Sequence, residues 1–233
     1  MFINVKKIKI VLFLFIVLGL CCMNPNAWAE KLPEGFCYLE GVVDGAEYDV
    51  RYYGENNFVG ERIDGYLAPK IILTTEAARK LKDAQRELSA FGLGFKFFDG
   101  YRPQRAVFHF VRWAENLPDT RMKHKFYPDV KKKNLFRDGY IAAKSGHSRG
   151  STIDLTIVDM KTGKELDMGT PFDFFGPKSW PENIEMSLQV RSNRALLRQV
   201  MIRNGFKPLK EEWWHFTLMN EPYPETYFDF PVQ

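Results

Sequence analysis

The sequence predicts an α+β fold, a single domain in which a small, mostly antiparallel sheet packs with helices. Three observations support this prediction. Helical periodicity is strongest early in the chain, before residue 115, and strand-like runs of apolar and β-branched residues are mixed with one further helix after it. No internal repeat or low-complexity linker divides the sequence. A chain of this length can bury a sizeable core as one domain.

The first helix is expected to begin at Thr74 or Thr75, either of which can cap it, and to end at Gly92. Its apolar stripe has alternating spacings of four and three residues and consists of Ala77, Leu81, Ala84, Leu88 and Phe91. Residues 95–98 indicate a short buried strand, and a turn at residues 99–103 leads into a second helix. The buried face of that helix is expected to carry Val107, Phe110, Val111 and Ala114.

The second half of the chain begins with residues 135–144, which have no clear pattern. Residues 152–158 predict a strand, and residues 161–182, which are rich in Gly, Pro and Phe, predict a long loop. A third helix is marked by the apolar residues 196, 197, 200 and 201 and ends at Asn204-Gly205. A last strand from Trp213 to Leu218 is expected to close the core.

Residues 1–29 have the three parts of a secretory signal peptide. The basic part contains three lysines between residues 6 and 9, and the apolar run at residues 10–22 is shorter than the ~20 residues of a membrane span. A small-x-small site, Ala27-Trp28-Ala29, precedes Glu30. We therefore expect cleavage after Ala29, export to the periplasm, and a mature domain of residues 30–233 without a membrane span.

Two other interpretations of this segment remain. A lipoprotein anchored through Cys21 or Cys22 is possible in principle, although Leu20 is bulky where a lipobox has a small residue. The segment could also stay attached as an uncleaved anchor. Cleavage would remove two of the three cysteines and leave Cys37 alone, which excludes an intramolecular disulfide and favours a buried thiol.

The formal net charge of +4 comes mostly from the lysines of the leader. The mature chain is therefore close to neutral, and no polycation is left that would indicate nucleic-acid binding. Residues 121–133 are locally basic and are expected to form a solvated loop. The sequence does not indicate an oligomeric state.

Two unusual strings carry the chemistry. Residues 145–154 read S-G-H-S-R-G-S-T-I-D, and residues 212–215 read E-W-W-H. Together they offer His147, Asp154 and His215 as ligands, and three protein ligands leave one position of a tetrahedral zinc open, as in catalytic sites. One zinc per chain, held at the sheet, is therefore expected. A single histidine is more often packed or solvated than a ligand, and this interpretation is kept for His109 and His124.

The spacing of the ligands fits a strand with a turn before it. His147 and Asp154 are seven residues apart and would face opposite sides of one flat strand. A break at Arg149-Gly150 would place His147 in the turn and let Asp154 point back toward it from the strand. Glu212 would lie at the mouth of the last strand, near the metal without being forced onto the face of His215.

Further polar residues each have a functional and a structural interpretation. Glu212 is either a general base for a metal-activated water or a solvated acid beside Glu211. Arg102 either stabilises the oxyanion of a tetrahedral intermediate or pairs with Asp99 at the surface. Asp173 is either a buried loop anchor or the partner of a substrate ammonium. The tryptophans at 213 and 214 are expected in the core and the pocket wall.

The chain closely resembles the D-alanyl-D-alanine dipeptidases of the VanX type, which are zinc peptidases related to D,D-carboxypeptidases. Ordered blocks along the mature chain carry the resemblance, and they include Y-D-V-R-Y at residues 48–52, N-F-V-G at 57–60, D-G-Y-R-P-Q-R-A-V from 99, the two ligand strings, M-G-T-P-F-D at 168–173 and E-P-Y-P-E-T-Y-F-D-F-P from 221. That many blocks in one order make the match far more specific than any single motif.

The resemblance implies a role for each matching position. The zinc ligands are His147, Asp154 and His215, and the base is Glu212 rather than Glu211, three residues before the last ligand. Arg102 is the arginine that stabilises the transition state.

The resemblance also implies that Asp173 and Tyr52 hold the free amino group of the dipeptide. One departure is Gly146, because members of this type often carry Ser immediately before the first histidine ligand.

The reaction implied is hydrolysis of D-Ala-D-Ala to two D-alanines by metal-activated water. A carboxylate at residue 173 that requires an ammonium would favour dipeptides, because a longer peptide would leave that carboxylate unpaired. The preference for D-residues comes from the resemblance alone. Two alternatives stay open: a zinc D,D-carboxypeptidase or endopeptidase that acts on cell-wall peptides, and a protein that binds wall fragments without cutting them. Nutrient salvage and glycopeptide resistance are both compatible with the sequence.

Protein isolated from the cell envelope should begin at Glu30, because the small-x-small site directs cleavage after Ala29. N-terminal sequencing measures this directly. A lipid-modified Cys21 or Cys22 at the N-terminus would identify a lipoprotein instead.

Overall fold

The computed structural model describes residues 31–233. The expected signal peptide and its cleavage site after Ala29 lie outside the described residues. The part from Leu32 to Gln233 is one structural unit. Within it, no helix is both long enough and apolar enough to span a bilayer.

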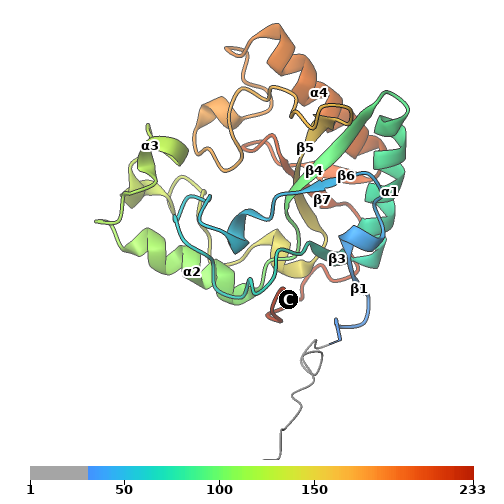
Figure 1. The fold of residues 1–233 in the computed structure, drawn as a ribbon. Coiled ribbons are helices and arrows are strands. Elements are labelled where there is room, and N and C mark those ends of the chain that lie inside the picture. Colours follow the sequence, from blue (N-terminus) through green and yellow to red (C-terminus); the bar gives the residue numbers. More distant parts are fainter. Residues whose placement is uncertain (1–30) are drawn as a thin grey trace, which may run out of the picture. The chain divides into compact units, whose positions relative to one another are not determined.

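A five-stranded sheet forms the centre of this unit, with the strand order β2-β4-β5-β7-β6 (Figure 1). The strands are β2 (Glu47–Tyr48), β4 (Leu93–Asp99), β5 (Thr152–Asp159), β7 (His215–Leu218) and β6 (Phe206–Pro208). Only the pairing of β2 with β4 is parallel, and the other three neighbouring pairs are antiparallel. A separate antiparallel pair joins β1 (Phe36–Tyr38) to β3 (Ile72–Thr74). The prediction of a mostly antiparallel sheet is confirmed.

Helices cover the sheet on two sides (Figure 1). On one side, α1 (Thr75–Ser89) packs against β4 and against α4 (Leu188–Arg203), which also contacts β6. On the other side lie α2 (Gln104–Glu115) and the short α3 (Lys123–Phe126). Short 3-10 helices complete the unit: η1 (Leu39–Gly41), η2 (Arg51–Tyr53), η3 (Lys132–Asn134), η4 (Gly146–Arg149) and η5 (Pro177–Ser179). The α+β class is therefore confirmed.

The first helix confirms the expected cap and most of the expected stripe. The Thr74 hydroxyl accepts a hydrogen bond from the backbone N–H of Ala77. The stripe from Ala77 to Leu88 is buried, but Phe91 is 78 % exposed. The helix ends at Ser89, so the chain has already left the helical path when it reaches Phe91. Including Phe91 in the buried face was therefore wrong.

The C-terminal elements differ from the predicted bounds in two places. The last helix begins at Leu188, where Ser187 caps it by accepting from the N–H of Val190, and it ends before Asn204 as expected. The last strand begins at His215 rather than at Trp213. The N–H of Trp213 donates to the carbonyl of Ser179 instead of to a neighbouring strand. Both tryptophans at 213 and 214 are buried in the core.

The basic segment 121–133 is not a solvated loop, because its lysines organise the backbone. The Lys123 ammonium donates to the carbonyls of residues 127, 128 and 130. The ammonium of the buried Lys132 donates to two carbonyls and lies 4.0 Å from the ring centroid of Trp113. Burial lowers the pKa of Lys132 to about 8.

Cys37 is half-buried rather than fully buried, and burial raises the pKa of its thiol.

The loop after η2 forms part of the wall of the pocket that is described below. The side chain of Asn57 holds this loop in place. This fully buried side chain donates to the carbonyls of Arg51, Gly54 and Glu61 and accepts from the N–H groups of Val59 and Gly60.

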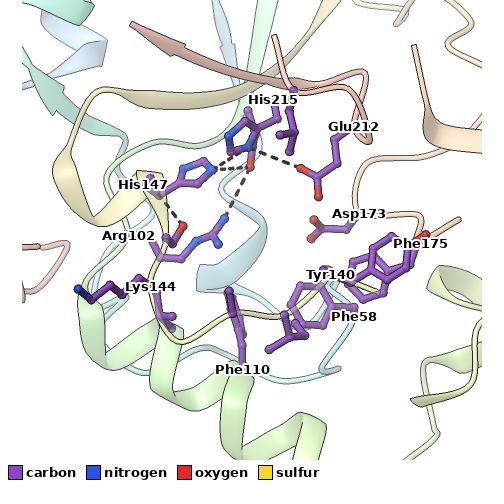
Figure 2. Close-up of a pocket in the computed structure, with 18 of the residues that line it drawn as sticks. Phe58, Arg102, Phe110, Tyr140, Lys144, His147, Asp173, Phe175, Glu212 and His215 are labelled. Atoms are coloured by element: carbon purple, nitrogen blue, oxygen red, sulfur yellow. Dashed lines mark hydrogen bonds and ion pairs between the residues drawn. The ribbon is translucent and has the colours of Figure 1, made fainter. Parts of the chain in front are cut away.

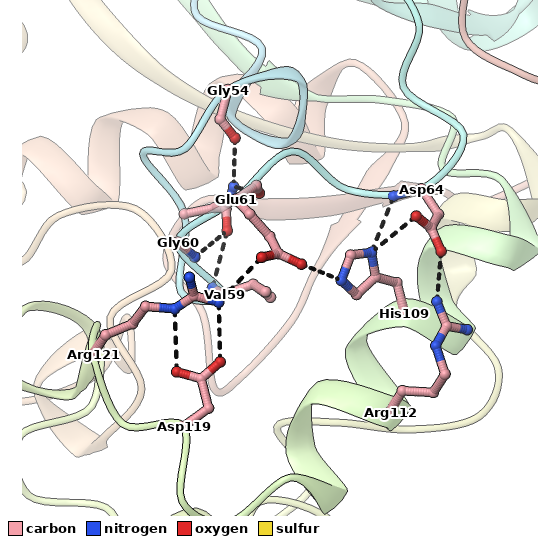
Figure 3. A network of polar contacts seen from close by, with 10 residues as sticks. Gly54, Val59, Gly60, Glu61, Asp64, His109, Arg112, Asp119 and Arg121 are labelled. Carbon is pink, nitrogen blue, oxygen red and sulfur yellow. Dashed lines mark hydrogen bonds and ion pairs between the residues drawn. The ribbon is translucent and has the colours of Figure 1, made fainter.

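Charged side chains fasten the outside of the same loop (Figure 3). His109 on α2 lies between Glu61 and Asp64, and Arg121 bridges Glu61 to Asp119. These outer pairs are largely exposed, so each contributes little, and the buried amide carries most of the order.

Replacing Asn57 with Ala should lower the free energy of unfolding by about 2–3 kcal/mol, because buried backbone groups lose their partners. Urea unfolding followed by circular dichroism measures the change. The exposed neighbour is the control, and Asn56→Ala should stay near wild type. Equal stability of both variants would show that the loop does not depend on the buried amide.

Candidate metal centre and active site

Three adjacent structural elements bring the expected ligands together. Ser145 caps η4 by accepting from the N–H of His147, and Gly150 at φ +83° turns the chain into β5. Asp154 lies on β5 directly opposite His215, the first residue of β7. His147 therefore approaches from the turn and the other two residues from one face of the sheet, as the spacing predicted.

The distances fit a tetrahedral metal ion. Nε2 of His147 lies 3.3 Å from Nδ1 of His215 and 3.3 Å from Oδ2 of Asp154, and Nδ1 of His215 lies 3.1 Å from Oδ1 of Asp154. Zinc–ligand bonds of ~2.0–2.2 Å at tetrahedral angles place ligand atoms roughly 3.3 Å apart. The Asp154 Oδ1 atom is also buried without a hydrogen bond, as a ligand oxygen would be. The group can hold a metal ion.

A second layer of contacts orients the first histidine. Nδ1 of His147 lies 2.7 Å from the carbonyl of Gly100 and 3.3 Å from Oδ2 of Asp99. Donation from Nδ1 leaves the lone pair of Nε2 directed at the other two ligands, an arrangement common to metal-binding histidines. Asp99 is fully buried and accepts a 2.6 Å hydrogen bond from the Tyr66 hydroxyl.

Electrostatics within the triad favour the protonation states that a metal needs at Asp154 and His147, but not at His215. Burial alone would raise the pKa of Asp154, but the two histidines hold it well below its usual range. Burial lowers the pKa of His147 despite the carboxylates nearby. Burial would also lower the pKa of His215, but the close contact with the Asp154 carboxylate and its negative charge raise it. The carboxylate is thus ionised, and His215 must release a proton before it can bind a cation.

The structure gives the adjacent residues Glu211 and Glu212 different surroundings. The Glu212 carboxylate faces the triad, with Oε2 3.6 Å from Nδ1 of His215 (Figure 2). Burial raises the pKa of the Glu212 carboxyl to about 7, with Asp154 adding to the effect against the opposing influence of His215. Glu211 instead pairs with Lys210 away from the pocket. An acid with a raised pKa beside a metal triad is well suited to proton transfer.

Arg102 does pair with Asp99, but it lies in the wall of the pocket with 12% of its side chain exposed rather than at the surface. Its Nε and Nη2 atoms lie 2.9 and 2.8 Å from Oδ2 of Asp99, and Nη2 lies 3.6 Å from Oδ2 of Asp154. The guanidinium also lies over the rings of Tyr52 and Phe110. These contacts fix a permanent positive charge next to the ligand set.

Asp173 is held at the far wall of the pocket. Its Oδ2 atom accepts a 2.9 Å hydrogen bond from the buried Tyr52 hydroxyl. Its backbone has φ +60°, a conformation that few residues other than Gly adopt and that often occurs at functional positions. Burial, and after it the charge of Asp154, raises the pKa of Asp173 well above its usual value. Within residues 31–233, no lysine, arginine or histidine nitrogen lies within salt-bridge distance of this carboxyl, whose contact is the Tyr52 hydroxyl.

All of the predicted site residues line one cavity of about 240 Å³ (Figure 2). They are Tyr52, Arg102, His147, Asp154, Asp173, Glu212 and His215. Sequence reasoning did not identify the aromatic wall formed by Phe58, Phe110, Tyr140 and Phe175, or Lys144 at the rim. Asp99 in the D-G-Y-R-P turn was considered only as a partner of Arg102, because its contact with His147 depends on strand pairing that the sequence does not display. The tryptophans at 213 and 214 do not line this cavity.

The departure at Gly146 has a local explanation. A Cβ atom at this position would lie 2.9 Å from the Thr152 hydroxyl oxygen, which is closer than packing allows. That hydroxyl is itself within 3.0 Å of the Thr217 hydroxyl. Glycine at 146 and threonine at 152 are therefore compatible as a pair. The other two histidines lie elsewhere, with His109 between Glu61 and Asp64 and His124 exposed on α3.

An open triad of two histidines and a carboxylate, faced by an acid and a buried arginine, defines a metallopeptidase site. Comparison with known proteins identifies the family to which this site belongs. Residues 33–233 match the family model Peptidase_M15, described as D-ala-D-ala dipeptidase. A D-alanyl-D-alanine dipeptidase of Enterococcus faecalis is 41% identical over 201 residues, which cover 86% of this chain and all of the relative.

Two further relatives carry the same name. The one from Streptomyces coelicolor is 41% identical, with 84% of this chain and 98% of the relative covered. The one from Escherichia coli is 31% identical, with 77% and 82% covered. The chain belongs to the D-Ala-D-Ala dipeptidase family of peptidases.

The purified protein should bind about one transition-metal ion, and His147→Ala or His215→Ala should abolish binding. Elemental analysis after gel filtration measures the metal content. His109→Ala is the matched control and should retain the metal. Apparent affinity should fall as the pH drops, because His215 must lose its proton to bind. Full metal content in both triad variants would contradict the assignment.

Proposed function

We propose that this protein is a zinc-dependent dipeptidase that hydrolyses D-Ala-D-Ala to two D-alanines. One observation carries the proposal: a group of three potential metal ligands, an acid of raised pKa and a buried carboxyl hydrogen-bonded only to a tyrosine hydroxyl among the described residues line a single small cavity. The cavity of about 240 Å³ lies below the roughly 300–1,000 Å³ of pockets for drug-sized ligands, which favours a small substrate. The names of the relatives agree with this substrate.

The donor set suits one zinc ion per chain, held by His147, Asp154 and His215. Nitrogen and oxygen donors in a three-ligand open set are those of catalytic zinc sites, which supply a Lewis acid that activates water near neutral pH. Asp99 and the Gly100 carbonyl keep His147 in the tautomer that such a site needs.

Proton transfer falls to Glu212 in this proposal. Its carboxylate faces the triad and takes the proton of the attacking water, then delivers it to the departing amine. The charge of a bound cation would lower the pKa of this carboxyl from about 7, so that the basic form dominates at neutral pH. Arg102 stabilises the negative oxygen of the tetrahedral intermediate, and its contacts with Asp99 and two aromatic rings hold it ready.

Substrate selection falls to Asp173 and Tyr52. The ammonium of a dipeptide would supply the cationic partner that the Asp173 carboxylate lacks. A longer peptide or a blocked amine would bring a neutral group there and leave a buried charge unpaired. This arrangement supports a dipeptidase over the carboxypeptidase or endopeptidase alternative.

Export, with cleavage after Ala29, is part of the same proposal. An exported enzyme would meet dipeptides released from the cell wall, which fits salvage of D-alanine. The leader sequence alone supports this step.

Glu212→Ala should retain the metal and lose turnover by ~10²–10⁴-fold, the usual cost of a missing general base. Glu211→Ala is the adjacent control and should be mild, because its carboxylate lies outside the pocket. Release of D-alanine from D-Ala-D-Ala, measured together with metal content, tests both variants. Reversed behaviour of the two would place the base one residue earlier.

N-acetyl-D-Ala-D-Ala should be a very poor substrate, because acetylation removes the charge that Asp173 pairs with. Asp173→Ala should impair cleavage of the free dipeptide and narrow the difference between the two substrates. Tyr52→Phe should act in the same direction more weakly, since it removes a hydrogen bond of ~0.5–1.5 kcal/mol. Equal wild-type turnover of the free and acetylated dipeptides would favour the carboxypeptidase alternative.

A further inference from the structure

The C-terminal segment, residues 221–233, carries the motif E-P-Y-P-E-T-Y-F-D-F-P, which has no part in the proposed reaction. None of its residues lines the pocket. The segment is nevertheless fixed at both of its ends. The Glu221 carboxylate accepts hydrogen bonds of 2.9 and 2.7 Å from the Arg149 guanidinium, and the backbone of the buried Val232 is hydrogen-bonded to residues 65, 67 and 68. What lies between these two anchors is therefore held in a defined place.

The backbone of Phe228 joins the two turns that present site residues. Its N–H donates to the carbonyl of Ser148 at 2.8 Å, and its carbonyl accepts from the N–H of Gln104 at 3.0 Å. Ser148 directly follows the ligand His147. Gln104 lies two residues after Arg102 and is the first residue of α2. The direct contact between the turns, from the N–H of Arg102 to the carbonyl of His147, is longer at 3.3 Å. Phe228 therefore fixes the ligand turn relative to the start of α2.

Asp229 caps α2 from the other end of the chain. The first N–H groups of a helix have no partner within it, and Pro103, which precedes α2, offers no side-chain cap. The Asp229 carboxylate accepts from the backbone N–H of Arg105 at 2.7 Å and from its Nε at 3.0 Å. A carboxylate at this end of a helix is also favoured by the helix dipole. The first turn of α2 is thus held by residues 228 and 229.

The same segment holds the chain on the other side of Arg102. The Tyr101 hydroxyl donates to the carbonyl of Phe230 at 2.9 Å, and the two rings stack with their centroids 4.0 Å apart. The guanidinium of Arg102 is held by Asp99, but its backbone lies between two points that are bound to residues 228–230.

We propose that residues 228–230 are positioning residues, which keep Arg102 in the place relative to the metal ligands that turnover requires. This inference rests on the proposed function, because it takes Arg102 to stabilise the tetrahedral intermediate. Misplacement of such a group by about 1 Å can lower a rate as much as ~10²-fold. A loosened turn should weaken binding of the tetrahedral state and leave binding of the dipeptide itself nearly unchanged.

Turnover of D-Ala-D-Ala by the zinc-loaded protein gives the first test. Asp229→Ala should lower kcat about 5-fold with little change in KM and with full metal content, because the helix cap is lost while the metal ligands and Asp173 stay in place. Asp229→Asn should retain most of the activity, since an asparagine side chain also accepts from a helix N–H. Glu225, an exposed acid of the same segment, is the matched control, and Glu225→Ala should match wild type. An unchanged kcat in Asp229→Ala, or a higher KM at unchanged kcat, would overturn the proposal.

Binding of a phosphinate analogue of the dipeptide, which imitates the tetrahedral intermediate, separates this proposal from the proposed function because it needs no turnover. Calorimetry on the zinc-loaded protein should show about 5-fold weaker binding in Asp229→Ala, and no further weakening when Asp229→Ala is added to Arg102→Ala. This result would support the positioning role even if the wild-type protein cleaved nothing. Equal weakening with and without Arg102, or no binding of the phosphinate at all, would overturn it.

A second variant tests the contact on the other side of Arg102. Tyr101→Phe removes the hydrogen bond to Phe230 and keeps the stacked ring, so it should give a smaller loss of phosphinate binding in the same direction. Thermal unfolding followed by circular dichroism shows whether each variant is folded at the assay temperature. If Asp229→Ala is not folded, Tyr101→Phe decides in its place: a loss that disappears in the Arg102→Ala background supports the proposal, and a loss that persists there, or no loss, overturns it.

Discussion

The site depends on one row of polar residues that crosses three strands. Asp99 at the end of β4 pairs in register with Asp154 on β5, which pairs in register with His215 on β7. Residues opposite each other on neighbouring strands share a face, so backbone pairing alone brings these side chains together. A register shift in β4 between Phe97 and Asp99 makes this possible, because it brings Asp99 opposite Asp154. The triad is therefore a property of the sheet, and only His147 is supplied from a turn.

The carboxyl groups of that row and of the cavity beside it are gathered in a small buried space. Asp154, Asp173 and Glu212 line the cavity and Asp99 lies behind it, whereas Arg102 is a permanent cation that contacts Asp99 and Asp154. Unpaired buried charges are costly, which is why the pKa values of Asp173 and Glu212 are raised in the protein alone. A divalent cation at the triad and a substrate ammonium at Asp173 would bring the pocket close to neutrality. The proposed preferences for a metal and for a free amine would thus have a common origin in this imbalance.

The sequence predicted the parts of this arrangement that follow from local patterns. The stripe of α1, the turn at Arg149-Gly150 and the strand of Asp154 are local features, and the structure has them. The register shift that brings Asp99 behind His147 is a property of strand pairing, and no local pattern reports it. The prediction that the basic segment 121–133 forms a solvated loop was wrong for a related reason. Whether a lysine is solvated depends on which carbonyls and rings fold around it, and these come from other parts of the chain. The roles of the site residues were predicted mainly through the resemblance, because spacing alone left Glu211 and Glu212 equivalent.

Short substrates impose a further demand on such a site, because a dipeptide offers almost no side-chain surface to bind. Its recognition must come from its two charged ends and from exclusion of anything longer. In this protein the end at Asp173 is closed by buried aromatic residues. A buried charge discriminates strongly because an unpaired partner is costly. In the proposed mode of binding, the contact between the substrate ammonium and Asp173 therefore decides which substrates are accepted.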